Sequence, residues 1–183
     1  MTAESVSIKG PRLALRLIRP EDADYAYELR TNPAYNTYLS AVRGTIEDQR
    51  LWISAYKIRE AAGEEYYYVI ERLDDGRPCG LVRIYDIEND HFTWGSWILD
   101  VNKPAKAALE SAVLSFDFGF SLPGMNYALI DVRRANIHAE KFYRRFGMIE
   151  LGSDTQDIFF TYPREFFLRD RATHFTALTE GQS

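Results

Sequence analysis

Three strand-like segments follow one another along residues 66–100, and no helical segment separates them. The first two are joined by Asp74-Asp75-Gly76, a tight-turn sequence that predicts a hairpin. A long apolar segment from Pro104 to about Phe120 predicts a helix, and a further strand is expected at 125–132. Hairpin strands are antiparallel, whereas strands joined through a helix are parallel. The chain is therefore expected to form an α/β fold with a mixed sheet and helices on both faces.

The remaining segments extend this sheet to about seven strands. Pro20 is expected to open a helix that Asn32-Pro33 ends, and Thr45 is expected to cap a second helix that Gly63 ends. The length of 183 residues suits one domain, with its core at about 10–165. The first ten residues and the polar C-terminal tail after about Thr173 are expected to be loose. Further strands are expected at 12–18, 148–151 and 157–162, and a further helix at 136–146.

The sharpest local feature is the strand-to-helix junction WILDVNKPAKAA at 97–108. Pro104 fits the first helical position, because its missing N–H would be unpaired there anyway. The first N–H groups of a helix have no intrahelical partner and lie at the positive end of the helix dipole. Lys103 and Lys106 add positive charge, and the neighbouring alanines let a phosphate approach the backbone. The junction is a candidate phosphate site, and simple helix capping with solvated lysines is the alternative.

A second motif lies in the segment DVRRANIHAEKFYRRFGM at 131–148. Asn136 is expected to begin a helix, and Ala139 and Tyr143 follow three and seven residues later, so all three share one helix face. We expect Tyr143 to look toward the cleft edge that holds the phosphate site. The alternative is a core aromatic residue on an amphipathic helix.

The order of elements and these spacings resemble the GNAT acetyltransferase superfamily, over roughly residues 10–165. In that family the last helix carries Asn, a small residue and Tyr and ends in Gly-Phe, and Met148 stands here in place of the Phe. The strand GSWIL at 95–99 is similar to the family's G-Y-W-I-L pattern. Counted onward without a gap, the family's pyrophosphate loop Q/R-x-x-G-x-G/A falls on 103–108, where Lys106 replaces the first Gly.

The resemblance implies acetyl-CoA as co-substrate, no metal, and Tyr143 as the catalytic proton donor to the departing thiolate. Backbone N–H groups near Ile98 and Leu99 are expected to hold the thioester carbonyl oxygen. The proton acceptor stays open among Asp86, Glu88, His91, Asp100, Asp131 and a water relay. The expected cofactor-binding residues are Ile98, Leu99, Val101, Lys103, Ala105, Lys106, Ala107, Ala108 and Asn136.

The acceptor is expected to be the primary amine of a small molecule. The sequences GSWI at 95–98 and DVRRAN at 131–136 are similar to acetyltransferases of bacterial surface-polysaccharide pathways, which acetylate amino groups of nucleotide-linked sugars. Asn36, Tyr38 and Tyr68 are the expected substrate-binding residues, because a tyrosine-rich wall suits stacking and hydrogen bonding. A protein or peptide amine, and a non-catalytic acyl-CoA-binding module, are the alternatives.

Charge and composition exclude several other classes of protein. The net charge of −5 argues against nucleic acid as a partner, since phosphate binding needs clustered basic charge. The single cysteine, Cys79, excludes an intramolecular disulfide and a Cys-based zinc site. The N-terminus lacks the apolar run of a signal peptide, and no stretch approaches the roughly 18 apolar residues of a membrane span. We expect a cytoplasmic monomer or homodimer without a membrane partner.

Overall fold

The computed structural model describes residues 7–180, and one eight-stranded sheet runs through it in the order β1-β2-β3-β4-β5-β6-β8-β7. Neighbouring strands are antiparallel except β5 and β6, which are parallel, so the prediction of a mixed sheet is confirmed. The strand beyond the expected seven is β1, two residues that pair with β2. The strands are β1 (Ile8–Lys9), β2 (Leu13–Leu17), β3 (Tyr66–Arg72), β4 (Pro78–Tyr85), β5 (His91–Leu99), β6 (Tyr127–Arg133), β7 (Ile149–Ser153) and β8 (Asp157–Pro163).

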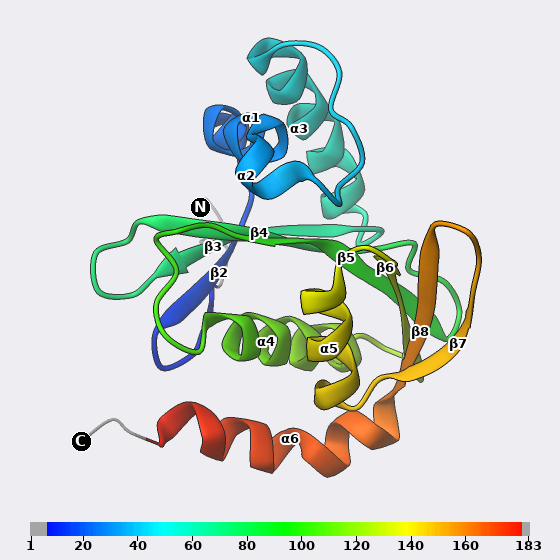
Figure 1. Cartoon of the computed structure of the whole chain (residues 1–183). Coiled ribbons are helices and arrows are strands. Elements are labelled where there is room, and N and C mark those ends of the chain that lie inside the picture. The colour runs from blue at the N-terminus through cyan, green and yellow to red at the C-terminus, as the bar shows by residue number, and fades with distance from the viewer. Residues whose placement is uncertain (1–6, 181–183) are drawn as a thin grey trace.

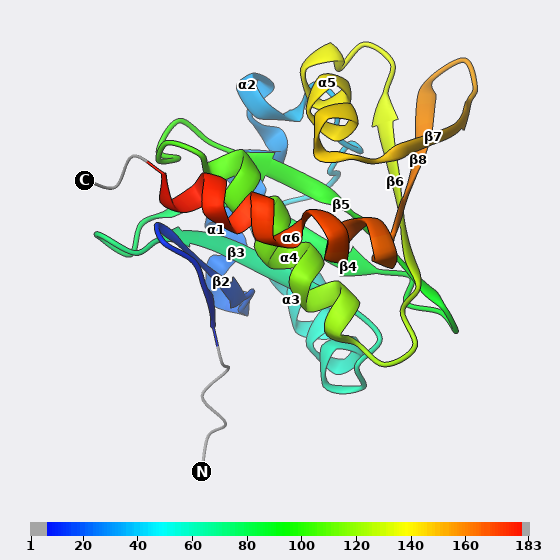
Figure 2. The same cartoon turned by 90° about the horizontal axis from the view of Figure 1, so that it is seen from below.

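Helices cover both faces of the sheet, as predicted. Figure 1 shows α1, α2 and α3 on one face and α4, α5 and α6 on the other. Seen from below, α6 crosses the outer side of α4 (Figure 2). Among the helices of residues 7–180, none combines the length and apolar character that crossing a membrane requires. The helices are η1 (Pro20–Asp22), α1 (Ala23–Thr31), α2 (Pro33–Asn36), α3 (Ile46–Ala61), α4 (Ala107–Ser121), α5 (Ile137–Phe146) and α6 (Arg164–Thr179).

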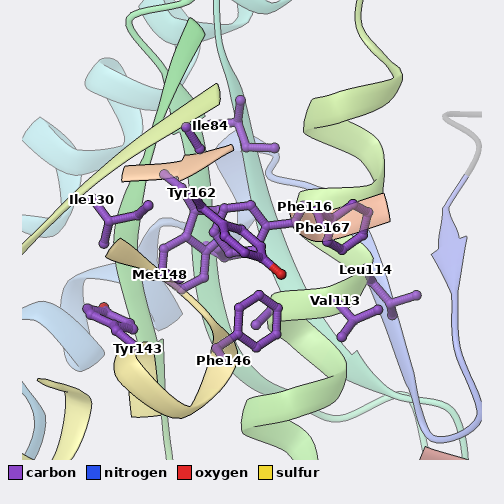
Figure 3. Packing of buried hydrophobic residues seen from close by; sticks show 14 of the residues in the cluster. Ile84, Val113, Leu114, Phe116, Ile130, Tyr143, Phe146, Met148, Tyr162 and Phe167 are labelled. Carbon is purple, nitrogen blue, oxygen red and sulfur yellow. The ribbon is translucent and has the colours of Figure 1, made fainter. Parts of the chain in front are cut away.

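The alternation of side chains along β3 builds a separate core on each face of the sheet. Tyr67 and Val69 point toward α1 and α3, where they pack in the smaller core. Tyr68 and Ile70 point the other way and join the larger core beneath α4, α5 and α6. Phe116 of α4 is at the centre of that larger core, where aromatic side chains from α5, α6 and β8 gather around it (Figure 3).

The parallel pair β5 and β6 separates partway along its length. The two strands pair only at His91, Phe92 and Thr93, although β5 continues to Leu99. A β-bulge follows in β5, where two residues, Ser96 and Trp97, stand opposite one residue of β4. Ser96 takes a left-handed φ of 48° at this bulge. Because a bulge bends its strand, the second half of β5 turns away from β6 and leaves a wedge between them.

Two predictions about the helices are wrong. The long apolar helix begins at Ala107 rather than at Pro104, because Lys106 takes a left-handed φ of 63° that an α-helix cannot include. The tail after Thr173 is not loose, because it completes α6. Leu178 of this helix is fully buried, and the α6 C-terminus is held by Lys106 Nζ, which donates to the Ala177 carbonyl at 2.5 Å.

Candidate active site

Two pockets meet at the wedge between β5 and β6. The first, here called the tyrosine pocket, has a volume of about 190 Å³ and is lined by Arg30, Tyr35, Tyr38, Tyr85, Asp131 and Tyr143, among others. The second, here called the strand-edge pocket, has a volume of about 410 Å³ and is lined by Ile98, Leu99, Lys103, Ala108, Phe142 and Arg145, among others. Tyr35, Trp97 and Asn136 line both pockets, so the two adjoin each other.

Trp97 is held firmly at this junction. Its indole Nε1 donates to Ser111 Oγ at 3.0 Å, and one turn further along α4 Ser115 Oγ accepts from Trp94 Nε1 at 2.8 Å. Both serines face the sheet because they are spaced four residues apart on one side of the helix. The polar end of each tryptophan is therefore satisfied, and the Trp97 ring is held where it lines both pockets.

Tyr143 is placed by α5, whose N-cap is Asn136. The Asn136 side chain accepts a hydrogen bond from the Ala139 backbone N–H at 3.2 Å, as expected of an N-cap. Tyr143 is 6% exposed and packs against Trp94 and Trp97, while it still lines the tyrosine pocket. Burial raises the pKa of its hydroxyl well above the ordinary value, and the nearby Asp131 carboxylate raises it further. At neutral pH the hydroxyl therefore stays protonated.

Asp131 brings a carboxylate into the same pocket from β6. Desolvation by the surrounding protein atoms raises the pKa of this carboxyl, and the Asp157 carboxylate adds to the effect. The guanidinium of Arg133 opposes this shift and lowers the pKa. The net result is a carboxyl whose pKa is raised above that of an ordinary aspartate, in a pocket that Tyr143 also lines.

The start of α4 forms one side of the strand-edge pocket. The first i-to-i−4 bond of this helix runs from Glu110 N to Lys106 O at 2.9 Å, so the Ala108 N–H precedes the hydrogen-bonded ladder. Ala108 lines the pocket, and Lys103 and Arg145 bring positive charge to it. Ile98, Leu99 and Phe142 add apolar wall. The pocket therefore combines a helix start and two cations with an apolar wall.

Seven of the thirteen residues that the sequence suggested as the proton donor or as cofactor- or substrate-binding residues line the two pockets. Tyr143 and Tyr38 line the tyrosine pocket, and Asn136 lines both pockets. The remaining four line the strand-edge pocket, namely Ile98, Leu99, Lys103 and Ala108.

Other expected cofactor residues lie outside both pockets. Val101 is 81% exposed on the turn after β5, and Ala107 is buried in the larger core. Lys106 points its side chain at α6, where it binds the carbonyls of Ala177 and Glu180, because its left-handed backbone turns it that way. Ala105 is exposed on the loop before α4 and does not line the strand-edge pocket.

Two expected substrate residues are also placed elsewhere. Tyr68 is 3% exposed and packs against Phe118 of α4, with ring centroids 5.6 Å apart, because the strand alternation directs it into the larger core. Asn36 ends the one-turn helix α2 and lines neither pocket, whereas its neighbours Tyr35 and Tyr38 do.

The fold distinguishes among the five side chains that were considered as proton acceptors. Asp131 is the one of the five that lines the tyrosine pocket. Asp100 instead accepts hydrogen bonds from Tyr25 Oη at 2.8 Å and from the Asn102 N–H at 2.7 Å. His91 pairs with Asp90 and stacks on Tyr127, at the paired end of β5. Asp86 and Glu88 belong to the turn between β4 and β5 and line neither pocket.

Sequence reasoning missed several residues of the site. Arg145 has a visible signal, since it follows Phe142 by three residues and shares its helix face. Tyr85 and Arg30 have no such signal in the sequence, because each reaches the tyrosine pocket from an element that is distant in sequence from the helix of Tyr143.

Comparison with known proteins agrees with this geometry. The family described as Acetyltransferase (GNAT) domain matches residues 12–149. Among solved structures, the chain is similar to apo FdhC, a nucleotide-linked sugar GNAT, with 36% identity, coverage of 95% of this chain and 99% of that chain, and a TM-score of 0.87. No curated protein sequence matches the chain.

More distant structures share the fold. Ribosomal-protein-S5-alanine acetyltransferase from Vibrio fischeri is 14% identical over 88% of this chain and 98% of that chain, with a TM-score of 0.75. Spermidine N-acetyltransferase from Vibrio cholerae, solved with CoA and spermine, is 18% identical over 85% of this chain and 98% of that chain, with a TM-score of 0.72. Because the family match covers most of the chain and a solved member is 36% identical along nearly its whole length, the chain belongs to the GNAT acetyltransferase family and is an acyltransferase.

Proposed function

We propose that this enzyme transfers the acetyl group of acetyl-CoA to the amino group of a nucleotide-linked sugar. The observation that carries the proposal is that the tyrosine pocket and the strand-edge pocket adjoin at Trp97 and Asn136, and that Tyr143 lines the tyrosine pocket. The similarity to FdhC, a nucleotide-linked sugar GNAT, supports this class of acceptor.

The strand-edge pocket fits acetyl-CoA, which supplies the acetyl group as a thioester. Lys103, Arg145 and the amides at the start of α4 suit the pyrophosphate, because anions bind where helix N–H groups and cations converge. The apolar wall of Leu99 and Phe142 suits the pantetheine chain. The unpaired half of β5 leaves backbone groups near Ile98 available to the thioester carbonyl.

Lys103→Glu is expected to weaken acetyl-CoA binding by about 10- to 30-fold. The reversal replaces an attraction by a repulsion, and each is worth about 1 kcal/mol for unit charges about 4 Å apart in water. The dissociation constant from isothermal titration calorimetry checks this, and the effect should shrink at high salt. Lys9→Glu makes the same charge change at an exposed lysine of β1 and serves as the control. Equal affinities of the two variants would remove Lys103 from the cofactor site.

In the proposed reaction, Tyr143 donates one proton and Asp131 accepts another. The neutral amine attacks the thioester carbonyl carbon, and the C–S bond breaks. Tyr143 donates its hydroxyl proton to the departing sulfur, and Asp131 takes the proton that the amine nitrogen loses. Exchange with solvent then restores both side chains. The directions of the two pKa shifts suit these roles, because Tyr143 stays protonated and Asp131 becomes a better base.

Asp131→Asn is expected to change the acidic limb of the pH profile. The raised pKa means that Asp131 becomes protonated at a higher pH than an ordinary aspartate as the pH falls. Below this pKa, log kcat/KM of the wild type should fall with a slope of about 2, since both the amine and the carboxyl must lose a proton. The variant should keep a slope of about 1. Asp86→Asn is the matched control, and an unchanged slope of about 2 in Asp131→Asn would leave proton removal to water.

A substrate panel tests the proposed function as a whole. Amino-sugar nucleotides, polyamines and N-terminal peptides are assayed with acetyl-CoA, and the proposal expects the highest kcat/KM for an amino-sugar nucleotide. A clear preference for peptides would indicate that the acceptor is a protein or peptide amine rather than an amino sugar. Binding of acetyl-CoA without transfer to any amine would indicate an acyl-CoA-binding module. Native mass spectrometry of the same sample reports whether the protein is a monomer or a homodimer.

A further inference from the structure

Arg30 is a cation of the tyrosine pocket that the protein leaves almost without partners. Within residues 7–180 it forms no ion pair, whereas Arg133 in the same pocket pairs with Asp157 at 3.2 Å. Its Nη2 donates to the Ser40 carbonyl at 3.5 Å, which is the outer limit of a hydrogen bond. Its Nε is buried and has no hydrogen-bond partner in the described part of the chain.

We propose that Arg30 binds an anionic group of the acceptor, so that the enzyme selects amines that also carry a phosphate. A guanidinium has five N–H donors arranged for bidentate contact with a phosphate or carboxylate. A partly buried charge without a partner is costly, and an anionic ligand removes that cost when it binds. This inference rests on the proposed function and adds to it the group that recognises the substrate.

The placement of charge in the pocket supports this selection. Arg30 enters from α1, whereas Asp131 enters from β6 and lies near enough to Tyr143 of α5 to raise the pKa of its hydroxyl. Within the described residues, no nitrogen of Arg30 comes within 4.0 Å of an Asp131 oxygen, so the two do not form an ion pair. The pocket therefore offers a carboxylate to the amine and a guanidinium to an anion. A polyamine lacks the anion and would place a cation near Arg30.

Tyr38 and Tyr85 strengthen the case for a ring-bearing acceptor. Tyr38 is 41% exposed and lines the same pocket as Arg30. Tyr85 is stacked by the Arg83 guanidinium at 4.4 Å from its ring centroid, which holds its ring in place. Rigid aromatic rings give large contact area at low cost in conformational entropy, which suits a sugar or a base.

The test compares Arg30→Met with Arg43→Met. Arg43 is exposed in the loop before α3 and lines neither pocket, so its substitution makes the same change in charge without changing the site. The acceptors are an amino-sugar nucleotide, the corresponding amino-sugar 1-phosphate and the free amino sugar. Arg30→Met is expected to reduce the preference for the nucleotide over the free amino sugar, measured as the ratio of kcat/KM values, by about 10- to 100-fold. Arg43→Met should keep the wild-type ratio, and Arg30→Lys should recover part of it.

A binding measurement keeps this inference separate from the proposed function. Uridine diphosphate and thymidine diphosphate are titrated into protein saturated with CoA, which occupies the strand-edge pocket. The inference expects at least one of them to bind to the wild type and to Arg43→Met and to bind about 10- to 100-fold more weakly to Arg30→Met. If the diphosphates bind in this way but no amino sugar is acetylated, the proposed function is overturned and the anion site is retained. A different result would overturn the anion site alone. In that case the amino sugars are acetylated, but Arg30→Met keeps both the wild-type ratio of kcat/KM for the nucleotide over the free amino sugar and the wild-type affinity for the diphosphates.

The sugar 1-phosphate locates the anion that Arg30 binds. If Arg30→Met reduces kcat/KM for the 1-phosphate as strongly as for the nucleotide, the phosphate attached to the sugar is the partner. If the reduction is confined to the nucleotide, the second phosphate is the partner. Either result supports the anion site, provided that the thermal unfolding temperature of Arg30→Met matches that of Arg43→Met.

Discussion

Tyr143→Phe is expected to lower kcat by about 10²- to 10⁴-fold, while the dissociation constant of acetyl-CoA stays nearly unchanged. The substitution removes the hydroxyl that would protonate the departing sulfur and keeps the ring that packs against Trp94, Trp97 and Phe160. Tyr143 does not line the strand-edge pocket, so the cofactor contacts should persist. Steady-state kinetics give kcat, and isothermal titration calorimetry gives the affinity.

Tyr162→Phe is the matched control for this experiment. Tyr162 is fully buried in the same core, lines neither pocket, and has a hydroxyl without a hydrogen-bond partner within residues 7–180. Its removal should leave kcat at the wild-type value and should not lower stability, because an unsatisfied buried polar group contributes nothing favourable. Wild-type turnover in Tyr143→Phe would exclude this tyrosine as the proton donor, whereas a parallel loss of acetyl-CoA affinity would indicate a structural role.

Phe116→Ala is expected to lower the free energy of unfolding by about 3–5 kcal/mol. The Phe116 ring is fully buried, and its centroid lies 4.9 Å from that of Trp94 and 5.3 Å from that of Tyr162. It also packs against Phe146 of α5 and Phe167 of α6, so one side chain joins the sheet to three helices (Figure 3). Its loss leaves a cavity that these rigid neighbours fill poorly.

Denaturant unfolding checks the size of this effect, and Phe159→Ala is its control. Phe159 is 39% exposed on β8, so the same truncation there should leave no cavity and cost much less. Similar losses in the two variants would mean that the larger core does not depend on Phe116. A much greater loss of catalytic activity than of stability in Phe116→Ala would indicate that Phe116 also helps to position Tyr143, because Trp94 contacts both residues.

Local patterns in the sequence predicted most of the secondary structure. Thr45 forms the expected cap of α3, where its side chain accepts from the Asp48 N–H at 3.2 Å. Asn136 caps α5, and Gly147 ends it with a left-handed φ of 106°. These features depend on residues a few positions apart, so a single sequence is sufficient to find them. No helix was predicted at 164–179, where α6 lies, because its polar composition hides the few side chains that bury against α4.

The sequence by itself determined the mixed sheet, the capped helix that carries Tyr143, and the likeness to the GNAT superfamily, because each follows from short-range order along the chain. Only the tertiary structure decided which side chains share the pockets. It brought Arg30, Tyr85 and Asp131 from α1, β4 and β6 to one cavity, turned Tyr68 into the core, and directed Lys106 to the end of α6. The physical reason is that pocket membership depends on strand register, on the β-bulge at Ser96 and on a left-handed residue before α4, and these arise from contacts between segments far apart in the sequence.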